Sequence, residues 1–289
     1  MTLGVVVIGR NEGEKLRLCL QSVLGLGYPV VYADSDSSDG SVRLADGLGV
    51  AVVKLDPSRP MNAARGRKEG CSRLLHDHPE VEFVLFLDGD CVLDKAFVPA
   101  AIKVMQNRPE VAVVCGCRSE LHPEASVFNR IANLEWNTPV GERDSCGGDA
   151  LYRVDVYKQA GGFDESVLAG EEPELCGRIN RLGCKILRLD VAMSWHDMGM
   201  TRLSQWWRRG VRSGYGALDV RVRFGLPYFN RQLASAWTWG LGWPLLSTGF
   251  AALAAFRGGL AASFWIVLLA CSLLLLQVLR VARMGHARG

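Results

Sequence analysis

Residues 83–90 read Phe-Val-Leu-Phe-Leu-Asp-Gly-Asp, five apolar residues in a row followed by two aspartates one residue apart. An uninterrupted apolar run is typical of a strand that is buried on both faces in a parallel sheet covered by helices. Such a sheet binds its ligands beyond the carboxyl ends of its strands, where Asp88 and Asp90 stand. Two carboxylates this close repel each other unless a cation lies between them, and their oxygens suit Mg²⁺ or Mn²⁺. The alternative is a solvated turn, because Asp-Gly-Asp is also common turn chemistry.

The N-terminal part of the chain alternates buried strands with helices. Apolar residues recur at helical spacing over 16–24, with Asn11 as the expected N-cap, and two more helices fit 61–76 and 95–107. The predicted strands are 3–8, 30–33, 50–55, 81–87 and 111–115. This order predicts an α/β fold with a mixed, mostly parallel sheet.

Polar residues gather where three of these strands end. Arg10-Asn11 follows the first strand, residues 34–41 follow the second, and Asp88-Gly89-Asp90 follows the fourth. Because the carboxyl ends of neighbouring parallel strands meet at one edge of a sheet, we expect these side chains to surround one ligand. Neither G-x-G-x-x-G nor G-x-x-x-x-G-K-[ST] occurs, which disfavours a dinucleotide-dependent dehydrogenase and a P-loop nucleotidase.

The charge of the chain is segregated along its 289 residues. The formal net charge of +3 combines −7 over residues 1–200 with +10 over residues 201–289, where 11 basic residues face one acid. A chain that is 49% apolar and 22% charged is not disordered, and its modest net charge argues against nucleic acid as a partner. The front and the rear of the chain therefore have different roles.

The rear of the chain predicts a membrane hairpin. Residues 260–279 carry no charge and are long enough to cross a bilayer, and residues 233–256 are also uncharged, although their glycines and Pro244 leave a re-entrant or interfacial segment as the alternative. Seven arginines over 202–231 predict a basic amphipathic segment on anionic lipid, or else a solvated helix face. The positive-inside bias then places the N-terminal domain in the cytoplasm, on an inner or plasma membrane.

Six motifs, in this order, resemble those of the family 2 glycosyltransferases, which have the GT-A fold. The resemblance covers about residues 3–215 and implies a GT-A domain over 1–200, an interfacial segment over 201–231 and a membrane hairpin over 232–289. The motifs are the opening strand at 5–12, a D-S-G-S-T-D-G-S-like segment at 31–41, an A-R-N-like segment at 62–66, the DxD at 88–90, a G-G-N…G-G-F-D-E-like pair at 146–149 and 161–165, and a G-E-D-x-E-L-x-x-R-like segment at 170–178.

The resemblance implies a role for each matching residue. Asp90 would hold Mn²⁺ or Mg²⁺ with Asp88, and His196 is a candidate third ligand or a structural histidine. Glu172 would be the catalytic base, with Glu171 assisting it or fixing its geometry; the alternative is a plain acidic helix start. The donor would contact Arg10, Asn11, Asp34, Asp36, Asn62, Arg65 and Asp88, and the acceptor Gly148, Asp149 and Trp136.

Three positions depart from the family pattern. Asp36 replaces a glycine, Gly66 replaces the asparagine of A-R-N, and Glu172 stands where an aspartate is usual. Trp207, Arg208 and Arg209 lie in the basic segment, where they would bind a diphosphate or lie at the membrane interface.

The predicted function is inverting, metal-dependent transfer of a sugar from a nucleotide-diphosphate sugar, with UDP-sugar as the expected donor. The expected acceptor is a hydroxyl of a glycolipid, a polyprenyl-linked molecule or a saccharide used in polysaccharide synthesis, with membrane lipid as a further partner. One alternative is a transferase that acts on polyprenyl phosphate. Another is an inactive scaffold that binds the nucleotide sugar without turning it over.

Overall fold

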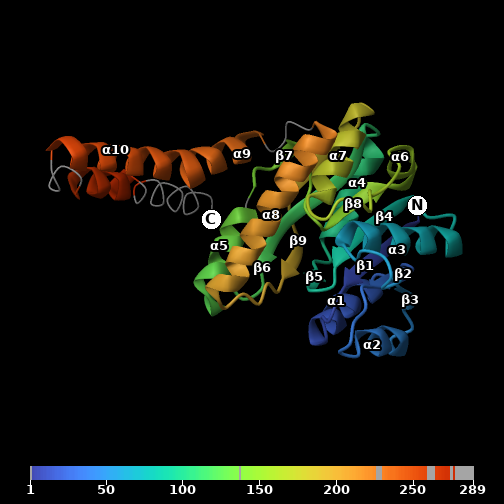
Figure 1. The fold of residues 1–289 in the computed structure, drawn as a ribbon. Helices are drawn as coiled ribbons and strands as arrows, with labels where there is room; N and C mark the ends of the chain where they lie inside the picture. Colours follow the sequence, from blue (N-terminus) through green and yellow to red (C-terminus); the bar gives the residue numbers. More distant parts are fainter. Residues whose placement is uncertain (1, 137, 226–229, 259–263, 274–275, 277–289) are drawn as a thin grey trace. The chain divides into compact units, whose positions relative to one another are not determined.

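The computed structural model describes residues 2–136, 138–225, 230–258, 264–273 and 276. These fall into two compact units, Met1–Leu226 and Pro227–Gly289. The first unit includes helix α8 (Leu203–Phe224), which covers most of the predicted interfacial segment. Figure 1 labels the helices and strands of both units.

The first unit is built on one mixed sheet. Among the described residues it has nine strands in the order β3-β2-β1-β4-β8-β6-β9-β5, with β7 paired to β9. Strands β3, β2, β1 and β4 are parallel neighbours, whereas β8 is antiparallel to both β4 and β6. The strands are β1 (Leu3–Gly9), β2 (Val30–Asp34), β3 (Ala51–Lys54), β4 (Phe83–Asp88), β5 (Cys91–Leu93), β6 (Val111–Glu120), β7 (Gly141–Arg143), β8 (Ala150–Arg153) and β9 (Lys185–His196).

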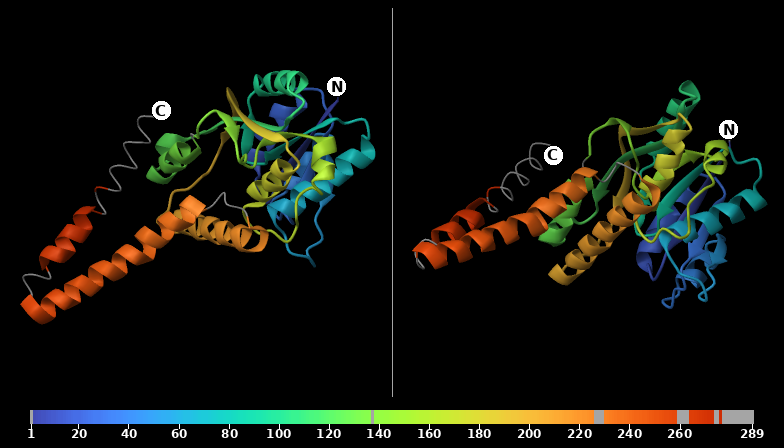
Figure 2. Two further views of the ribbon diagram at one scale, coloured as in Figure 1. Left: turned by 90° about the horizontal axis from the view of Figure 1, so that it is seen from above. Right: turned by 45° about the horizontal axis from the view of Figure 1, so that its top comes forward.

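Helices cover both faces of this sheet (Figure 2). They are α1 (Glu14–Leu24), α2 (Ser41–Gly47), α3 (Ala63–Asp77), α4 (Phe97–Asn107), the short 3₁₀ helix η1 (Pro123–Ala125), α5 (Val127–Trp136), α6 (Val154–Gln159), α7 (Glu171–Arg181) and α8. The five predicted strands and the three predicted helices are confirmed, as is the mixed, mostly parallel sheet. The short or polar strands β5, β7, β8 and β9 were not expected.

Helix α3 lies very close to β1 because glycine is present on both elements. A side chain on Gly70 would lie 2.6 Å from Val6, and one on Gly4 would lie 2.6 Å from Leu74. These contacts determine how closely α3 packs on β1. The sheet and α3 can therefore present side chains to the same edge of the molecule.

The expectation that Asn11 caps α1 is wrong. The residue before α1 is Gly13, and it makes no side-chain cap. Asn11 instead has φ of 58° and accepts a hydrogen bond from the Ser38 backbone at 2.8 Å. Its side chain is thus committed to the loop after β2, which a helix-start pattern does not reveal.

The second unit contains one helix that is long and apolar enough to cross a membrane, Leu233–Arg257, among the residues that the structure describes. It lies within a longer helical stretch formed by α9 (Asn230–Ala236), a π-helical turn η3 (Trp237–Gly242) and α10 (Trp243–Gly258). Gly240 and Gly242 lie in the π turn, and the helix continues into α10 after them. Of the second predicted span, 260–279, the described part contains a short apolar helix, Phe264–Leu273; residues 260–263, 274–275 and 277–279 lie outside the described part. Trp243 Nε1 donates to the Ala270 carbonyl at 3.4 Å, so the two helices of this unit are in contact.

Two glycines of α8 give a prediction on packing. A Cβ on Gly216 would lie 2.6 Å from the Ala169 carbonyl oxygen, whereas a Cβ on Gly214 meets nothing within 4 Å. We expect Gly216→Ala to lower the free energy of unfolding by about 2 kcal/mol through overpacking. Gly214→Ala should raise it by up to ~1 kcal/mol, because alanine favours the helix. Denaturant unfolding of both variants in detergent tests this, and equal effects would contradict the packing of α8 on Ala169.

Candidate active site

Three strand ends meet at one edge of the sheet, as the sequence predicts. Asp88 of β4 is level with Ile8 of β1, and Asp34 of β2 is level with Gly9. The segments that follow β1, β2 and β4 therefore leave the sheet side by side. The site is assembled from these segments and from helices α3 and α7.

The loop after β2 is held in shape by buried polar contacts. Asp34 is 1% exposed and accepts hydrogen bonds from the Tyr32 hydroxyl and the Ser37 backbone, both at 2.8 Å. Asp36 is exposed and has φ of 64°, the left-handed conformation that glycine favours, and aspartate is among the few residues that tolerate it. Asp36, which replaces a glycine of the family pattern, therefore adopts a backbone conformation that glycine favours.

This loop forms one wall of a hollow of about 440 Å³, which is lined by Asp34, Asp36, Ser37, Ser38, Gly40, Val42, Arg43, Lys54, Leu55 and Pro57. Asn11 supports the wall from behind through Ser37 and Ser38. Arg10 is exposed. Two residues predicted to bind the sugar donor, Asp34 and Asp36, line the hollow. Two basic residues outside the 31–41 motif, Arg43 and Lys54, also line it.

The other predicted donor residues shape the start of α3. Asn62 accepts from the Arg65 backbone at 2.9 Å as the N-cap, and its amide donates to the Glu165 carbonyl at 2.8 Å. The Arg65 guanidinium is buried and donates to Glu69 and to the carbonyls of Asp56 and Arg59. These contacts commit Arg65 to ordering the loop before α3.

Asp88 lies between two arginines. One oxygen accepts from Arg67 of α3 at 2.8 Å, and the other accepts from Arg118 of β6 at 2.9 Å. Burial alone would raise the pKa of Asp88, but the two guanidinium groups lower it to about 2. Asp88 is therefore a fixed anion whose two oxygens are already engaged.

Arg118 is in turn held by Asp149, a predicted acceptor residue. Asp149 is fully buried and accepts from Arg118 Nε at 3.0 Å, from the Ser194 hydroxyl at 2.6 Å and from the Asp88 backbone at 3.0 Å. In this structure Asp149 supports Asp88, and its contact with the acceptor stays a prediction. Gly148 lies so close that a Cβ there would be 2.7 Å from both Arg67 and Asp88.

Asp90 faces His196, which ends β9. Their oxygen and Nε2 are 3.2 Å apart, and Trp136 packs edge-on against the imidazole at 4.9 Å. Burial lowers the pKa of His196, but the carboxylates of Asp90 and Glu120 together outweigh this effect and raise the pKa to about 9. Asp90 and His196 form a close set of possible metal ligands with Cys91, whose pKa burial raises well above the usual range, so its thiol is neutral.

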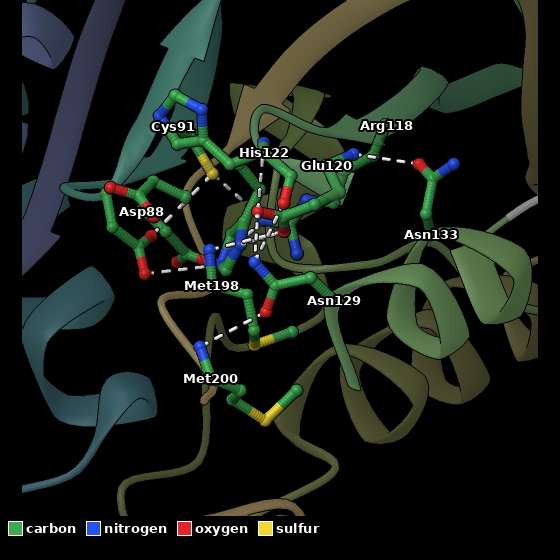
Figure 3. Close-up of polar contacts among 12 residues, drawn as sticks. Asp88, Cys91, Arg118, Glu120, His122, Asn129, Asn133, Met198 and Met200 are labelled. Carbon is green, nitrogen blue, oxygen red and sulfur yellow. Dashed lines mark hydrogen bonds and ion pairs between the residues drawn. The ribbon is translucent and has the colours of Figure 1, made fainter. Parts of the chain in front are cut away.

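Glu120 supports the segment that follows His196. Its side chain is buried and accepts from Asn129 Nδ2 at 3.1 Å and from the Met198 backbone at 3.2 Å, and Figure 3 shows it held between these two residues. Asn129 also accepts from the Met200 backbone at 3.1 Å. The position of His196 thus depends on a buried polar network.

Glu171 and Glu172 open helix α7, and Arg67 joins them to Asp88. Arg67 Nη1 lies 2.7 Å from Glu171, and Nη2 lies 3.4 Å from Glu172. Burial raises the pKa of Glu172 to about 7, and the charge of Glu171 acts in the same direction. A carboxylate with such a pKa can accept a proton near neutral pH.

The basic residues of α8 lie in two different environments. Arg209 forms an ion pair with Glu135 at 2.6 Å, whereas Arg208 and Trp207 border a separate cleft. The three residues that the sequence grouped together therefore do not share one site.

Sequence reasoning missed three charged residues of the site. Arg67 and Arg118 hold Asp88, and Glu12 lies beside Gly89, with a pKa that burial and the charge of Asp90 raise to about 7. Glu12 is the last residue of the opening-strand motif and Arg67 directly follows the A-R-N-like segment, but neither motif shows that these side chains turn toward the site. Arg118 lies in a strand with no motif at all.

A family model and several curated proteins match this chain. The model of the glycosyl transferase family 2 matches residues 4–160, so the chain belongs to that family. The pre-mycofactocin glycosyltransferase of Mycobacterium tuberculosis is 26% identical over 232 residues, which is 76% of this chain and 47% of that protein. The O-antigen chain rhamnosyltransferase WbaN of Salmonella anatum is 22% identical, over 60% of this chain and 57% of its own. The chain thus spans about half the length of the curated relatives it matches.

Solved structures show the same fold at low sequence identity. Glucosyl-3-phosphoglycerate synthase from Mycobacterium tuberculosis, solved with Mn²⁺, UDP and glucosyl-3-phosphoglycerate, is 20% identical with a TM-score of 0.53, over 78% of this chain and 81% of its own. The mannosyltransferase PcManGT from Pyrobaculum calidifontis, solved with GDP-Man and Mn²⁺, is 19% identical with a TM-score of 0.51, over 94% and 86%. The GT-A fold expected from the motifs is therefore confirmed.

The buried pairs of Arg118 give a stability prediction. Arg118→Met leaves the fully buried Asp149 without its cation, and we expect a loss of about 3 kcal/mol in the free energy of unfolding. Arg209→Met breaks an exposed pair with Glu135 and should cost less than about 1 kcal/mol. Denaturant unfolding of both variants measures the difference. Similar small losses would show that Arg118 does not hold the site together.

Proposed function

We propose that this chain is an inverting, metal-dependent glycosyltransferase that moves a sugar from a nucleotide-diphosphate sugar, with UDP-sugar as the expected donor. One observation carries the proposal: Arg67 joins the carboxylate of the DxD motif to the two glutamates of the base motif, so both motifs face one site. The relatives that share the family act on sugars, and the structures that share the fold were solved with UDP or GDP-Man.

The residues around Asp90 suit a divalent cation. Asp90 offers a carboxylate oxygen, the ligand type that Mn²⁺ and Mg²⁺ prefer. His196 would offer its nitrogen, 3.2 Å from that oxygen, once a cation replaces the proton on the imidazole. A cation held there would neutralise negative charge on the departing nucleoside diphosphate. Asp88, fixed by its two arginines, would then orient the donor and add negative potential.

Glu172 is suited to remove the proton of the attacking hydroxyl. Its side chain is 16% exposed, so it can reach a bound acceptor, and its pKa of about 7 lets it hold the proton afterwards. Glu171, whose oxygen is held by Arg67, fixes the start of α7. A single displacement from the face opposite the diphosphate inverts the anomeric carbon.

The acceptor would be a hydroxyl of a glycolipid, a polyprenyl-linked molecule or a saccharide at a membrane. Support comes from the apolar helix Leu233–Arg257 and from the arginines of α8, which suit anionic lipid. On this proposal the catalytic domain faces the cytoplasm at an inner or plasma membrane. Gly148 and Trp136 border the site and remain candidates for its acceptor side.

The metal site gives the first functional prediction. With Mn²⁺ and a panel of UDP-, GDP- and dTDP-sugars, the full chain in detergent should release nucleoside diphosphate, and EDTA should stop it. Asp90→Asn should lower this activity by about 10³-fold or more, because charge neutralisation is usually the largest catalytic effect. Asp46→Asn, an exposed aspartate on α2, is the matched control. Nucleotide binding without turnover would instead support an inactive scaffold.

The base gives the second functional prediction. Glu172→Gln should lower transfer by about 10²–10⁴-fold, whereas Glu172→Asp, the residue usual in the family, should keep measurable transfer. Because the carboxyl loses its proton near pH 7, the wild-type rate should fall about tenfold per pH unit well below 7 and level off above it. Full transfer by the Gln variant would remove Glu172 from this role. Product formed from polyprenyl phosphate without a sugar acceptor would favour the alternative acceptor.

A further inference from the structure

A second cleft lies against α8, apart from the hollow after β2. It has a volume of about 700 Å³, within the range of small-molecule sites. Its lining residues are Met61, Asn62, Leu168, Ala169, Trp207, Val211, Tyr215, Arg208 and Arg212. The lining is mostly apolar with two cations, which is not the composition of a nucleotide site.

The floor of the cleft is an exposed apolar stripe. Trp207, Val211 and Tyr215 recur every four residues along α8, and they are 65%, 58% and 54% exposed. Large apolar side chains grouped in the open are unfavourable in water unless something covers them. The stripe continues to Leu218 and Val222 beyond the cleft.

The two arginines of the cleft have no anionic partner among the described residues. Arg208 makes only a side-chain bond to the Ser204 carbonyl at 3.2 Å, and neither it nor Arg212 forms an ion pair with any described residue. Arg209, by contrast, is paired with Glu135. Two free guanidinium groups beside an apolar floor are complementary to a phosphate attached to a hydrocarbon chain.

The walls of the cleft lead to the active site. Met61 and Asn62 immediately precede α3, which carries Arg67, and Leu168 and Ala169 immediately precede Gly170 and the two glutamates of α7. The helix α8 is fixed to this wall, because Gly216 and Val220 pack on Ala169 and Gly170. One wall of the cleft is therefore formed by the residues that directly precede the helix carrying the proposed base.

We propose that this cleft binds the acceptor, and that the acceptor is an anionic amphiphile: its phosphate lies on Arg208 and Arg212, and its apolar chain lies on Trp207, Val211 and Tyr215. The proposal rests on the proposed transferase function and specifies its acceptor class. Residues 61–62, residues 168–169 and α8 all line the cleft, and a single bound amphiphile can contact all three segments.

The test is equilibrium binding of farnesyl phosphate to the full chain in detergent micelles. The double variant Arg208→Gln/Arg212→Gln should bind about a hundredfold more weakly, because each charged hydrogen bond contributes about tenfold. Trp207→Ala should bind about tenfold more weakly through lost apolar contact. Leu218→Ala on the same stripe and Arg223→Gln on the same helix should bind within about twofold of wild type, since neither lines the cleft.

Several results would overturn the proposal. If the double arginine variant binds like wild type, the cleft does not hold the phosphate. If Leu218→Ala weakens binding as much as Trp207→Ala, the whole stripe lies on the micelle and the cleft is not a ligand site. Inorganic phosphate should compete poorly, and complete competition at equal concentration would indicate a site for free anions.

The same samples separate this proposal from the proposed function. Release of nucleoside diphosphate from the donor without any acceptor is measured on the same wild-type sample as the binding of farnesyl phosphate. If wild type cleaves donor but does not bind farnesyl phosphate, the cleft proposal fails and the transferase stands. If it binds farnesyl phosphate as expected but cleaves no donor, the transferase fails instead.

Discussion

The ion pairs of Asp88 with Arg67 and Arg118 are the contacts on which the site depends. Arg67 is buried and the side chain of Arg118 is 16% exposed, and the two arginines connect different parts of the chain to β4. Arg67 belongs to α3 and reaches the glutamates of α7, and Arg118 belongs to β6 and reaches Asp149. Burying a charge is unfavourable unless it is paired, so neither arginine can move alone. This constraint sets two motifs that are more than eighty residues apart in sequence at one place.

The fold could be predicted where buried side chains leave a recognisable pattern in the sequence. The core strands β1, β2 and β4 are continuous apolar runs, and α1, α3 and α4 have helical spacing, so all six were expected. Strand β8 has only four residues, and β9 has charged residues within it, so neither has a clear period. The π turn at Trp237–Gly242 likewise has no pattern that marks it in the sequence.

The site could be predicted only as far as motifs mark it. The DxD and the strand-end acids lie near one another because parallel strands end at a common edge, and Arg67 joins the two glutamates of α7 to Asp88. The motif does not distinguish Arg65, which orders a loop, from Arg67, which reaches the carboxylates two residues later. Nor does it show that Asp149 is buried as a support. Side-chain direction on a helix or strand, and not residue type, decides these roles.

The most direct test of this account is a crystal structure of the full chain with Mn²⁺ and UDP, with the metal located by its anomalous signal. The account predicts Mn²⁺ bound by Asp90 and His196, with Asp88 still paired to Arg67 and Arg118. Mn²⁺ bound by Asp88 with both of its ion pairs broken, or no metal near Asp90, would contradict it.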